Sequence, residues 1–388
     1  MNPPIQRTTI LPRFIGLALA CFGLLPQTQA VSPAPDGGYP GGNTAEGQNA
    51  LFSLTTGGYN TAVGWLSLRN DTGGSFNTGV GAGTLSANTG DTNTATGAGA
   101  LLSNTIGVDN TANGAFALLN NAGGAGNTAT GSSTLNRNTT GGGNTANGAQ
   151  ALQSNTSGGI NTAIGYQALR INTTGGTNTV IGADALANNT TGNDNIALGW
   201  EAGSTVTTAN NVICIGVAGN NVDNSCYIGN IFNSTSSGGI AVFVNSNGRL
   251  GTMTSSARFK EDINPMNHAS DALYALKPIT FRYKKQVDLE GTSAMQFGLV
   301  AEDAEKVSPD LVVRDKEGKP YSVRYDQVNA MLLNEFLKEH KKVEKLEATV
   351  AQQHKDFEAA VAELKGQIQK VSTQLEASKP APQVVNNR

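Results

Sequence analysis

The hydrophobic pattern of the first two thirds of the chain is a short repeat in which one leucine returns at a fixed interval. The motif Asn-Thr-Ala-Xaa-Gly, or a close variant, begins ten times between Asn43 and Asn195, seventeen residues apart with one step of sixteen. Its fifth place is always glycine, and leucine fills the ninth place in nine units. A period this short, punctuated by Thr-Gly-Gly and Asn-Thr-Thr-Gly turn signals, predicts a parallel β-solenoid over residues 43–235.

The repeated leucine predicts where the core of the solenoid lies. Identical positions in stacked coils are about 4.8 Å apart, so we expect one buried apolar ladder made of Leu51, Leu68, Leu85, Leu101, Leu118, Leu135, Leu152, Leu169 and Leu186. The recurring glycine would serve a turn with positive φ or a close approach of two backbones. Each coil has little else to bury, which suggests that partner chains supply a second buried face.

The last part of the chain changes to a helical period. Residues 326–376 contain no proline and one glycine, Gly366, and their composition favours a long helix. Apolar residues recur every seven positions, and the positions four residues after them form a second heptad series. Together they make the a/d seam of a coiled coil, which we predict over 331–376. The two sets are Phe336, Val343, Val350, Phe357, Leu364 and Val371, and His340, Glu347, His354, Val361, Ile368 and Leu375.

The two histidines of this seam have two interpretations. His340 and His354 would form a pH- or metal-sensitive layer in a trimer, or they would only set register and oligomeric state, which we prefer. The residues that follow, 377–388, carry two prolines and predict a disordered tail.

Short elements of mixed type lie between the repeats and the helix. They predict a small α+β domain over 255–330, preceded by a junction over 236–254 that carries one more strand. The expected elements are a short helix at 272–276, a strand at 279–283, a strand leading into a helix at 296–303, and a hairpin of 311–313 with 321–325. After Asn195 the repeat loosens at 211–216 and 226–230, which we interpret as the cap of the solenoid.

The N-terminus has the pattern of an export signal. Arg7 and Arg13 precede an apolar run at 14–25, and small residues follow up to Ala30, so residues 1–30 predict a signal peptide and 31–42 a linker. Twelve apolar residues fall short of the ~20 that a membrane-spanning helix needs, so no span is expected once the signal is removed. Cys21 also admits a lipoprotein signal, but cleavage after Ala30 is favoured. The protein is therefore expected to be secreted or displayed at the cell surface.

Composition and charge argue against several classes of partner and activity for the repeats. A net charge of -3 gives no reason to expect nucleic acid or an anionic membrane as a partner. Acidic residues are sparse in the repeats and form no recurring pair of the kind that cleaves glycans. The repeats also lack histidine and the calcium-binding Gly-Gly-Xaa-Gly-Xaa-Asp motif, so no metal or cofactor is expected.

Two further patterns in the repeats suggest minor or local features. Threonine fills the second place of nine units and would form one column, as in ice-binding solenoids, although a flat binding face would need two. Export would place Cys214 and Cys226 in an oxidising compartment, where a disulfide between them is one interpretation and two small buried side chains the other.

The repeat units resemble the heads of trimeric autotransporter adhesins, whose repeat core is Asn-Ser-Val-Ala-Ile-Gly. The unit here is longer and richer in alanine and asparagine. The resemblance implies a parallel β-roll and a homotrimer, and leaves open a host, cell-surface or glycan ligand of the repeats.

The sequence changes character at Thr254-Ser255-Ser256-Ala257-Arg258-Phe259-Lys260. No lysine or histidine precedes Lys260, and the chain after it is charged and non-repetitive. Ser-Xaa-Xaa-Arg-Xaa-Lys followed by Glu-Asp-Ile resembles the start of the intramolecular chaperone domain of endosialidases and phage tail spikes, a self-cleaving serine peptidase family. The resemblance extends from Ser255 to about Lys342 and includes Leu-Lys-Pro at 276–278 and Gly-Leu-Val-Ala-Glu at 298–302.

This resemblance implies that Ser255 is the nucleophile, that Lys260 is its partner, and that the Thr254–Ser255 bond is cleaved. Ser256 stands where the family often has aspartate, which leaves the choice between the two serines slightly open, although only Ser255 has the five-residue spacing to Lys260. A serine hydroxyl can attack the carbonyl immediately before it, so the reaction is intramolecular and its entropy is largely prepaid. The product is an ester at Thr254, which water then hydrolyses.

The hydroxyl of Ser255 needs a base, and no histidine lies nearby in the sequence. Lys260 can act only if its pKa falls from ~10.4 towards neutrality through burial or a neighbouring charge such as that of Arg258. Burial of this kind is expected once three chains have packed, so trimerisation would gate cleavage.

The sequence therefore predicts an exported homotrimer, fibre- or adhesin-like, whose C-terminal chaperone drives folding and then releases itself by autoproteolysis, once and in cis. The alternatives are a non-cleaving trimeric surface adhesin and, less favoured, a solenoid with its own glycan- or ice-directed binding activity.

Overall fold

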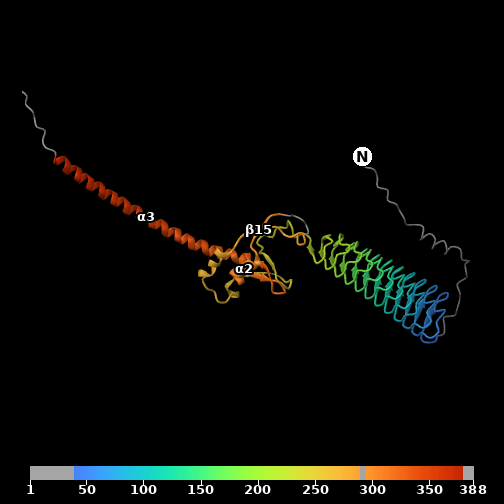
Figure 1. Cartoon of the computed structure of the whole chain (residues 1–388). Coiled ribbons are helices and arrows are strands. Elements are labelled where there is room, and N and C mark those ends of the chain that lie inside the picture. Colours follow the sequence, from blue (N-terminus) through green and yellow to red (C-terminus); the bar gives the residue numbers. More distant parts are fainter. Residues whose placement is uncertain (1–38, 289–293, 379–388) are drawn as a thin grey trace, which may run out of the picture. The chain divides into compact units, whose positions relative to one another are not determined.

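The computed structural model describes residues 39–288 and 294–378, and the chain divides into two compact units that meet between Thr235 and Ser236. Each unit is described by itself below, with the elements labelled as in Figure 1. The predicted signal peptide, most of the predicted linker and nearly all of the predicted tail lie outside the described residues. Within the described residues, no helix is long and apolar enough to cross a membrane.

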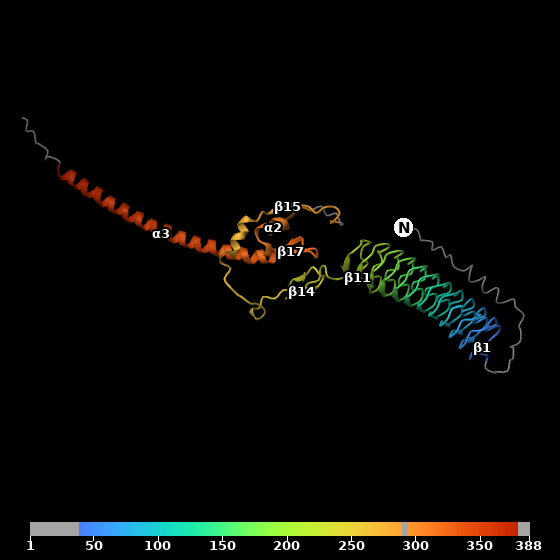
Figure 2. The ribbon, with the colours of Figure 1, turned by 60° about the horizontal axis from the view of Figure 1, so that its bottom comes forward.

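The first unit is the predicted parallel β-solenoid of seventeen-residue repeats. Its twelve strands pair in chain order and in parallel, one per coil, with successive coils stacked along the unit (Figure 2). They are β1 (Thr44–Glu46), β2 (Thr61–Val63), β3 (Thr78–Val80), β4 (Thr94–Thr96), β5 (Thr111–Asn113), β6 (Thr128–Thr130), β7 (Thr145–Asn147), β8 (Thr162–Ile164), β9 (Thr179–Ile181), β10 (Ile196–Leu198), β11 (Ile213–Ile215) and β12 (Cys226–Ile228). The loosened units at 211–216 and 226–230 therefore continue the sheet as its last two strands.

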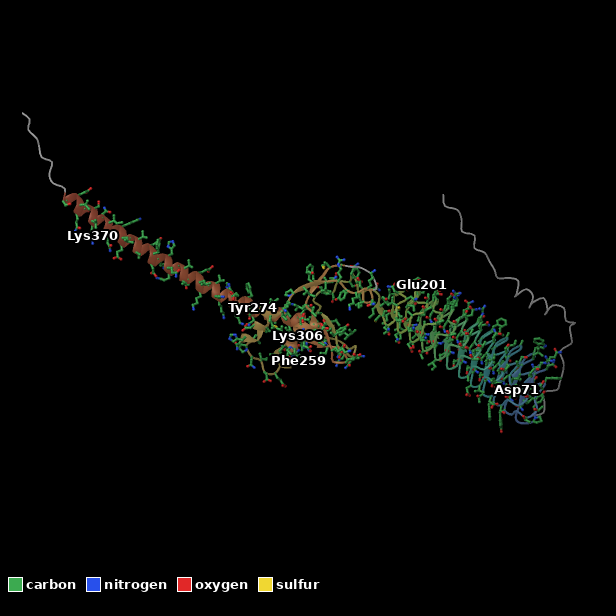
Figure 3. The ribbon with its side chains drawn as sticks, viewed as in Figure 1. Asp71, Glu201, Phe259, Tyr274, Lys306 and Lys370 are labelled. Atoms are coloured by element: carbon green, nitrogen blue, oxygen red, sulfur yellow. The ribbon has the colours of Figure 1, made fainter. Side chains whose placement is uncertain are left out.

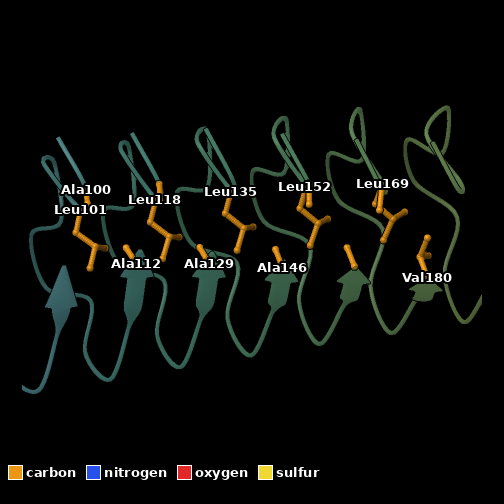
Figure 4. Close-up of a cluster of buried hydrophobic side chains, with 14 of the residues drawn as sticks. Ala100, Leu101, Ala112, Leu118, Ala129, Leu135, Ala146, Leu152, Leu169 and Val180 are labelled. Atoms are coloured by element: carbon orange, nitrogen blue, oxygen red, sulfur yellow. The ribbon is translucent and has the colours of Figure 1, made fainter. Parts of the chain in front are cut away.

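The leucine ladder is confirmed, and it lies against a ladder of small residues from the strands. Figure 4 shows Leu118, Leu135 and Leu152 stacked above Ala129 and Ala146 of the strands. From Leu68 to Leu186 each ninth-place leucine is at most 1% exposed within a single chain. A seventeen-residue coil thus closes over one leucine and its alanines within a single chain, and the second buried face expected from partner chains stays a prediction.

The fifth-place glycine meets both of its expected requirements. Gly148, for example, has a φ of 139°, and a Cβ atom there would lie 2.3 Å from the carbonyl oxygen of Gly165 in the next coil. A side chain at this place would therefore force stacked coils apart. The ninth-place leucines also have positive φ, as in Leu135 at 49°, a conformation that costs a residue with a side chain roughly 1–2 kcal/mol.

Two ladders of buried asparagine fill the rest of the interior. In the first, at the start of each repeat, Asn161 donates to Asn144 Oδ1 from both its backbone nitrogen and Nδ2, each at 3.0 Å. In the second, at the twelfth place, Asn138 Nδ2 donates to Asn121 Oδ1 at 2.7 Å and to the Gly141 carbonyl at 2.8 Å. The Nδ2 group of each asparagine therefore donates both to a backbone carbonyl of a turn and to the side-chain oxygen of the preceding rung. Because these polar groups are hydrogen-bonded, burying them costs little free energy.

The second ladder has a direction, and the residues at its two ends reflect it. Every amide donates towards the preceding coil, so the first member needs only acceptors, and that member is Asp71. Asp71 accepts from Gly74 N at 2.7 Å and from Asn77 and Asn88 Nδ2 at 3.3 Å each. At the other end Asn189 Oδ1 receives no hydrogen bond within the described residues, because Val206 takes the place of the next asparagine.

The two cysteines of the first unit are free thiols, so the structure does not contain the suggested disulfide. The register pairs Cys214 with Tyr227 and Cys226 with Ile213. Neighbouring positions on paired strands point to opposite faces of a sheet, so Cys214 is buried in the coil while Cys226 is exposed on the outer face. A bond between them would require one strand to turn over.

The second unit contains three antiparallel hairpins and a long helix. The hairpins pair β13 (Val242–Val244) with β14 (Leu250–Thr252), β15 (Ile279–Phe281) with β16 (Gln296–Gly298), and β17 (Val312–Arg314) with β18 (Pro320–Val323). The helices are α2 (Ala301–Val307), α3 (Tyr325–Ala377), and the 3₁₀ helices η1 (Ala257–Phe259), η2 (Asn267–Ala275) and η3 (Pro309–Leu311). The mixed region and the single long helix agree with the predicted architecture.

The core of the second unit is much thinner than that of the first. A cluster of Ala304, Val312 and Val323 is buried, with Leu276 and Leu299 among the side chains packed against it. Large apolar side chains nevertheless stay exposed along α3, including the predicted seam positions Phe336, Val343, Val350, Phe357, Leu364 and Val371. The apolar face of α3 is therefore left exposed in a single chain, whereas the leucine ladder of the first unit is buried.

Removing one rung of the second ladder should destabilise the solenoid. Asn138→Ala leaves Asn121 Oδ1 without its donor in a dry interior, so we expect the free energy of unfolding of the first unit to fall by about 1–3 kcal/mol. Urea denaturation followed by circular dichroism measures it. The matched control is Asn120→Ala, because Asn120 is exposed and its loss should change stability by less than about 0.5 kcal/mol. Equal effects of both substitutions would contradict the ladder's role.

The end of this ladder should make the stability of the first unit depend on pH. Burial raises the pKa of Asp71 above its ordinary 3.8, more than its hydrogen bonds lower it. Its contribution to stability is therefore largest below pH 3.8 and is lost as the pH rises through the pKa of the folded state. Asp71→Asn should gain stability relative to the wild type over this rise, measured by urea titration across roughly pH 3.5–6.5. Parallel pH profiles of the two proteins would contradict this assignment.

Candidate functional site

The candidate site is a single 3₁₀ turn at the start of the second unit's mixed region. η1 is closed by the Phe259 nitrogen donating to the Ser256 carbonyl and the Lys260 nitrogen donating to the Ala257 carbonyl, each at 3.1 Å. Ser255 precedes this turn and Lys260 follows it in extended backbone. The turn brings the two side chains together, and Lys260 Nζ donates to Ser255 Oγ at 3.1 Å.

The neighbouring residues of the turn are arranged differently from Ser255. Of the two serines in this part of the described chain, only Ser255 contacts Lys260, which fits its five-residue spacing. The Ser256 backbone nitrogen instead lies 3.4 Å from Thr254 Oγ1. The guanidinium carbon of Arg258 lies 4.6 Å from the centre of the Phe259 ring. The positive charge of Arg258 is therefore held by a cation–π contact.

The turn places a serine hydroxyl, which could act as a nucleophile, next to a lysine amine, and both groups are exposed to solvent. Ser255 and Lys260 are both open to solvent, and Phe259 beside them is 61% exposed. A lysine that donates to a serine cannot also take its proton, so the amine must first lose its own proton. The described residues contain no cluster of histidine, cysteine or carboxylate side chains that could hold a metal ion. The polar side-chain groups that this turn brings together are the Ser255 hydroxyl and the Lys260 amine.

A second polar cluster joins η2 to the first part of α3, and we call it the η2–α3 clamp. Its centre is the fully buried Ser270, whose hydroxyl donates to Glu335 and accepts from Asn334 Nδ2 at 2.6 Å. Lys338 Nζ lies 2.6 Å from Glu335 Oε1 and 2.8 Å from Asp271 Oδ1. Tyr274, labelled in Figure 3, donates to Glu335 Oε2 at 2.8 Å. The clamp fixes η2, which begins seven residues after Lys260, on the helix.

The clamp is strongest when its acids are ionised and its lysine is protonated. Hydrogen bonds from Lys338 lower the pKa of both Glu335 and Asp271, and Ser270 lowers that of Glu335 further. In return, Asp271 and Glu335 raise the pKa of Lys338. The contribution of the acids is present above their ordinary values of 4.5 and 3.8 and is lost as the pH falls through the lower folded-state values.

Sequence reasoning found the turn and missed the clamp. Ser255 and Lys260 are five residues apart, so one turn decides their contact. Ser270 and Glu335 are separated by 65 residues, and neither belongs to a recognisable motif. The only local signal was Glu335 and Lys338 one helical turn apart, which is as common on solvated helix faces as in binding sites.

The seam histidines interact with their own helix in the described chain. His340 Nε2 lies 3.5 Å from Glu344 and His354 Nδ1 lies 3.5 Å from Glu358, each one turn along α3. His340 is also stacked on Phe336, with ring centres 6.3 Å apart. Both histidines therefore interact with α3 itself in the described chain.

Comparison with protein-family models gives a match in this region. Residues 255–313 match the family model described as chaperone of endosialidase, Peptidase_S74. The match begins at Ser255 itself, follows the solenoid and ends in β17, short of α3. No curated protein and no solved structure matches the chain.

The clamp should hold η2 on the helix in solution. Glu335→Gln removes the carboxylate that accepts from Ser270, Tyr274 and Lys338, so we expect amide hydrogen exchange across Asn267–Ala275 to become about tenfold faster or more. The helical content of α3 should not change. Glu358→Gln is the matched control, because Glu358 is exposed farther along α3 and pairs with His354 among the described residues. Unchanged exchange in Glu335→Gln would show that packing alone docks η2.

Proposed function

We propose that this protein is an exported trimeric fibre or adhesin whose C-terminal unit is an intramolecular chaperone that cuts itself away between Thr254 and Ser255. The proposal rests mainly on Ser255, where two observations fall on the same residue. The family match begins at Ser255, and Lys260 contacts Ser255 directly. A chaperone of the endosialidase type suggests a trimeric, extracellular or phage-tail protein. The solenoid that precedes it would be the folded product.

The proposed reaction uses only groups of this turn. The Ser255 hydroxyl attacks the Thr254 carbonyl carbon, Lys260 takes the hydroxyl proton, and the peptide C–N bond breaks. The leaving amine of Ser255 takes up a proton, and the acyl group passes to Oγ as an ester. Water then hydrolyses the ester, giving a carboxylate at Thr254 and a free amino terminus at Ser255. Because nucleophile and carbonyl belong to adjacent residues, effective molarities up to ~10⁵–10⁸ M are available to a well-oriented pair.

The exposure of the turn in one chain supports a gate on this reaction. In the single chain Lys260 Nζ donates to Ser255 Oγ, so it cannot take the hydroxyl proton in this state. Contact with two further chains would cover the turn and remove water from Lys260, which favours the neutral amine. Scission would then follow assembly, so that a chain that has not found its partners keeps its chaperone.

Partner chains would also cover the apolar surface that the second unit leaves open. The exposed seam of α3, which includes Val343, Val350 and Leu364, has the heptad spacing of a coiled coil. Holding three chains together at their C-terminal units raises the local concentration of the repeats to the millimolar range typical of short tethers. The costly first coil of the solenoid would form more readily under that condition.

A non-cleaving trimeric adhesin is the main rival, since the same fold could keep its chaperone attached. The solenoid offers less support for a binding or catalytic activity of its own. Its threonine column is regular, but the second outer column changes from Val80 to Thr96, Asn113 and Ile164, so it lacks the paired ladders of an ice-binding face. Adhesive binding by the repeats therefore stays a proposal without an identified ligand.

The test is the appearance of a new amino terminus in assembled protein. Wild-type chain should yield two fragments, one beginning at Ser255 by amino-terminal sequencing and intact mass. Ser255→Ala should abolish the cut, and Lys260→Arg should slow it by at least about 10²-fold, because a guanidinium keeps a charged donor but cannot accept a proton.

The matched control for this test is Ser256→Ala, which should still be cut because Ser256 does not contact Lys260. Intact wild-type backbone in protein shown to be trimeric by light scattering would overturn self-cleavage and favour the adhesin. Cleavage at equal rates in monomers and trimers would overturn the gate alone.

A further inference from the structure

The outer face of the solenoid sheet changes character along its length. The first and third residues of each strand point away from the core, and the parallel register aligns them into two columns. From β4 to β7 both columns are polar: Thr94, Thr96, Thr111, Asn113, Thr128, Thr130, Thr145 and Asn147. From β8 to β12 they become mostly aliphatic, and five isoleucines remain 38–45% exposed: Ile164, Ile181, Ile196, Ile215 and Ile228.

We propose that this aliphatic stretch, the outer face of β8–β12, is a contact surface between copies of this chain. The proposal rests on the trimer of the proposed function and assigns the face by which the solenoids meet. Because the leucine ladder is complete within one chain, the core does not need these isoleucines. Their exposure costs hydration free energy in every rung, and a second copy presenting the same columns would remove that cost.

The charge pattern favours a second copy over other occupants. Neither outer column carries an ionisable acid or base from β8 to β11, and in β12 the outer columns hold Cys226 and Ile228, of which only the thiol can ionise. A face without acids or bases meets an identical face with no repulsion and needs no complementary partner. A glycan would instead be expected to find hydrogen-bonding groups, which the polar stretch of β4–β7 offers and the aliphatic stretch does not.

The size of the surface fits a contact made inside an assembly that is held elsewhere. The five isoleucines expose roughly a few hundred Å² of apolar surface, well below the ~800 Å² per partner of a free-standing interface. Such a face would not dimerise on its own. It would add stability once the C-terminal units keep the copies at high local concentration. The aliphatic stretch is also the part of the sheet nearest in sequence to that unit, with seven residues between Ile228 and Ser236.

The chain carries its own probe of this surface. Cys226 is exposed in the same column as Ile196 and Ile213, whereas Cys214 is buried on the other side of the sheet. If aliphatic faces of neighbouring copies meet, the Cys226 thiols of two copies come close. An oxidant or a short bis-maleimide would then join them covalently.

The experiment uses full-length chain with Cys21→Ser, to remove the cysteine of the predicted signal peptide, and Ser255→Ala, to keep the C-terminal unit attached. We expect cross-linked dimers through Cys226. Moving the thiol off the face with Cys226→Ser and Thr174→Cys should lower the cross-linked yield about tenfold or more, because Thr174 is exposed outside the strands. Ile215→Lys should lower the yield through Cys226 by a similar factor, since like charges would then oppose each other. Thr111→Lys, on the polar stretch, should leave it within about twofold.

The oligomeric mass of each sample separates this proposal from the one on which it rests. Light scattering that shows a trimer, together with equal yields whether the thiol is at Cys226 or is moved by Thr174→Cys, would overturn the assignment of the face and leave the trimer standing. A monomer at all concentrations would overturn both. The circular dichroism of Ile215→Lys should match the wild type, because Ile215 is 38% exposed and its replacement should not disturb the coil.

Discussion

The stacking of coils in register is the constraint on which the first unit depends. Because each residue lies above its counterpart from the preceding repeat, every position meets its own kind, and only residues that pair well with themselves can be buried. Leucine and alanine do so by packing. Asparagine does so because its amide carries both a donor and an acceptor, and the oxygen of Asn144 receives the next coil while its nitrogen serves the coil before. Glycine is required where two backbones approach too closely for any side chain, as at Gly148.

This constraint explains why so lean a sequence closes a core. A coil with one leucine and few other apolar side chains has too little apolar surface to fold as a compact domain. Hydrogen-bonded asparagines occupy the space that further hydrophobic residues would need, with no charge to desolvate until Asp71 ends the ladder. The same geometry makes the unit cooperative along its length, because a rung has its partners only when its neighbours are formed.

In a single chain the two units therefore differ in how fully they bury their apolar side chains. The solenoid buries its leucine and asparagine ladders within one chain, while the C-terminal unit buries a small cluster around Ala304 and Val312 and leaves the seam of α3 in water. Under the proposed function, the C-terminal units would bring the chains together and the repeat array would then grow coil by coil, since nucleation is the expensive step for a stack of weak units. The η2–α3 clamp, centred on Ser270 and Glu335, connects α3 to the segment that follows Lys260, so the helix and the turn are parts of one folded unit.

The sequence by itself determined everything that a local or periodic rule governs. The seventeen-residue period set the solenoid and its leucine ladder, the heptads set α3, and five-residue spacing with a single turn set the Ser255–Lys260 contact. The tertiary structure decided which side chains are buried, which stay exposed, and which residues distant in sequence come into contact. Closure of each coil within one chain, the opposite orientations of Cys214 and Cys226, and the 65-residue contact of Ser270 with Glu335 follow from the path of the backbone in three dimensions. No spacing along the chain reports these features, because burial and orientation depend on neighbours that are distant in sequence.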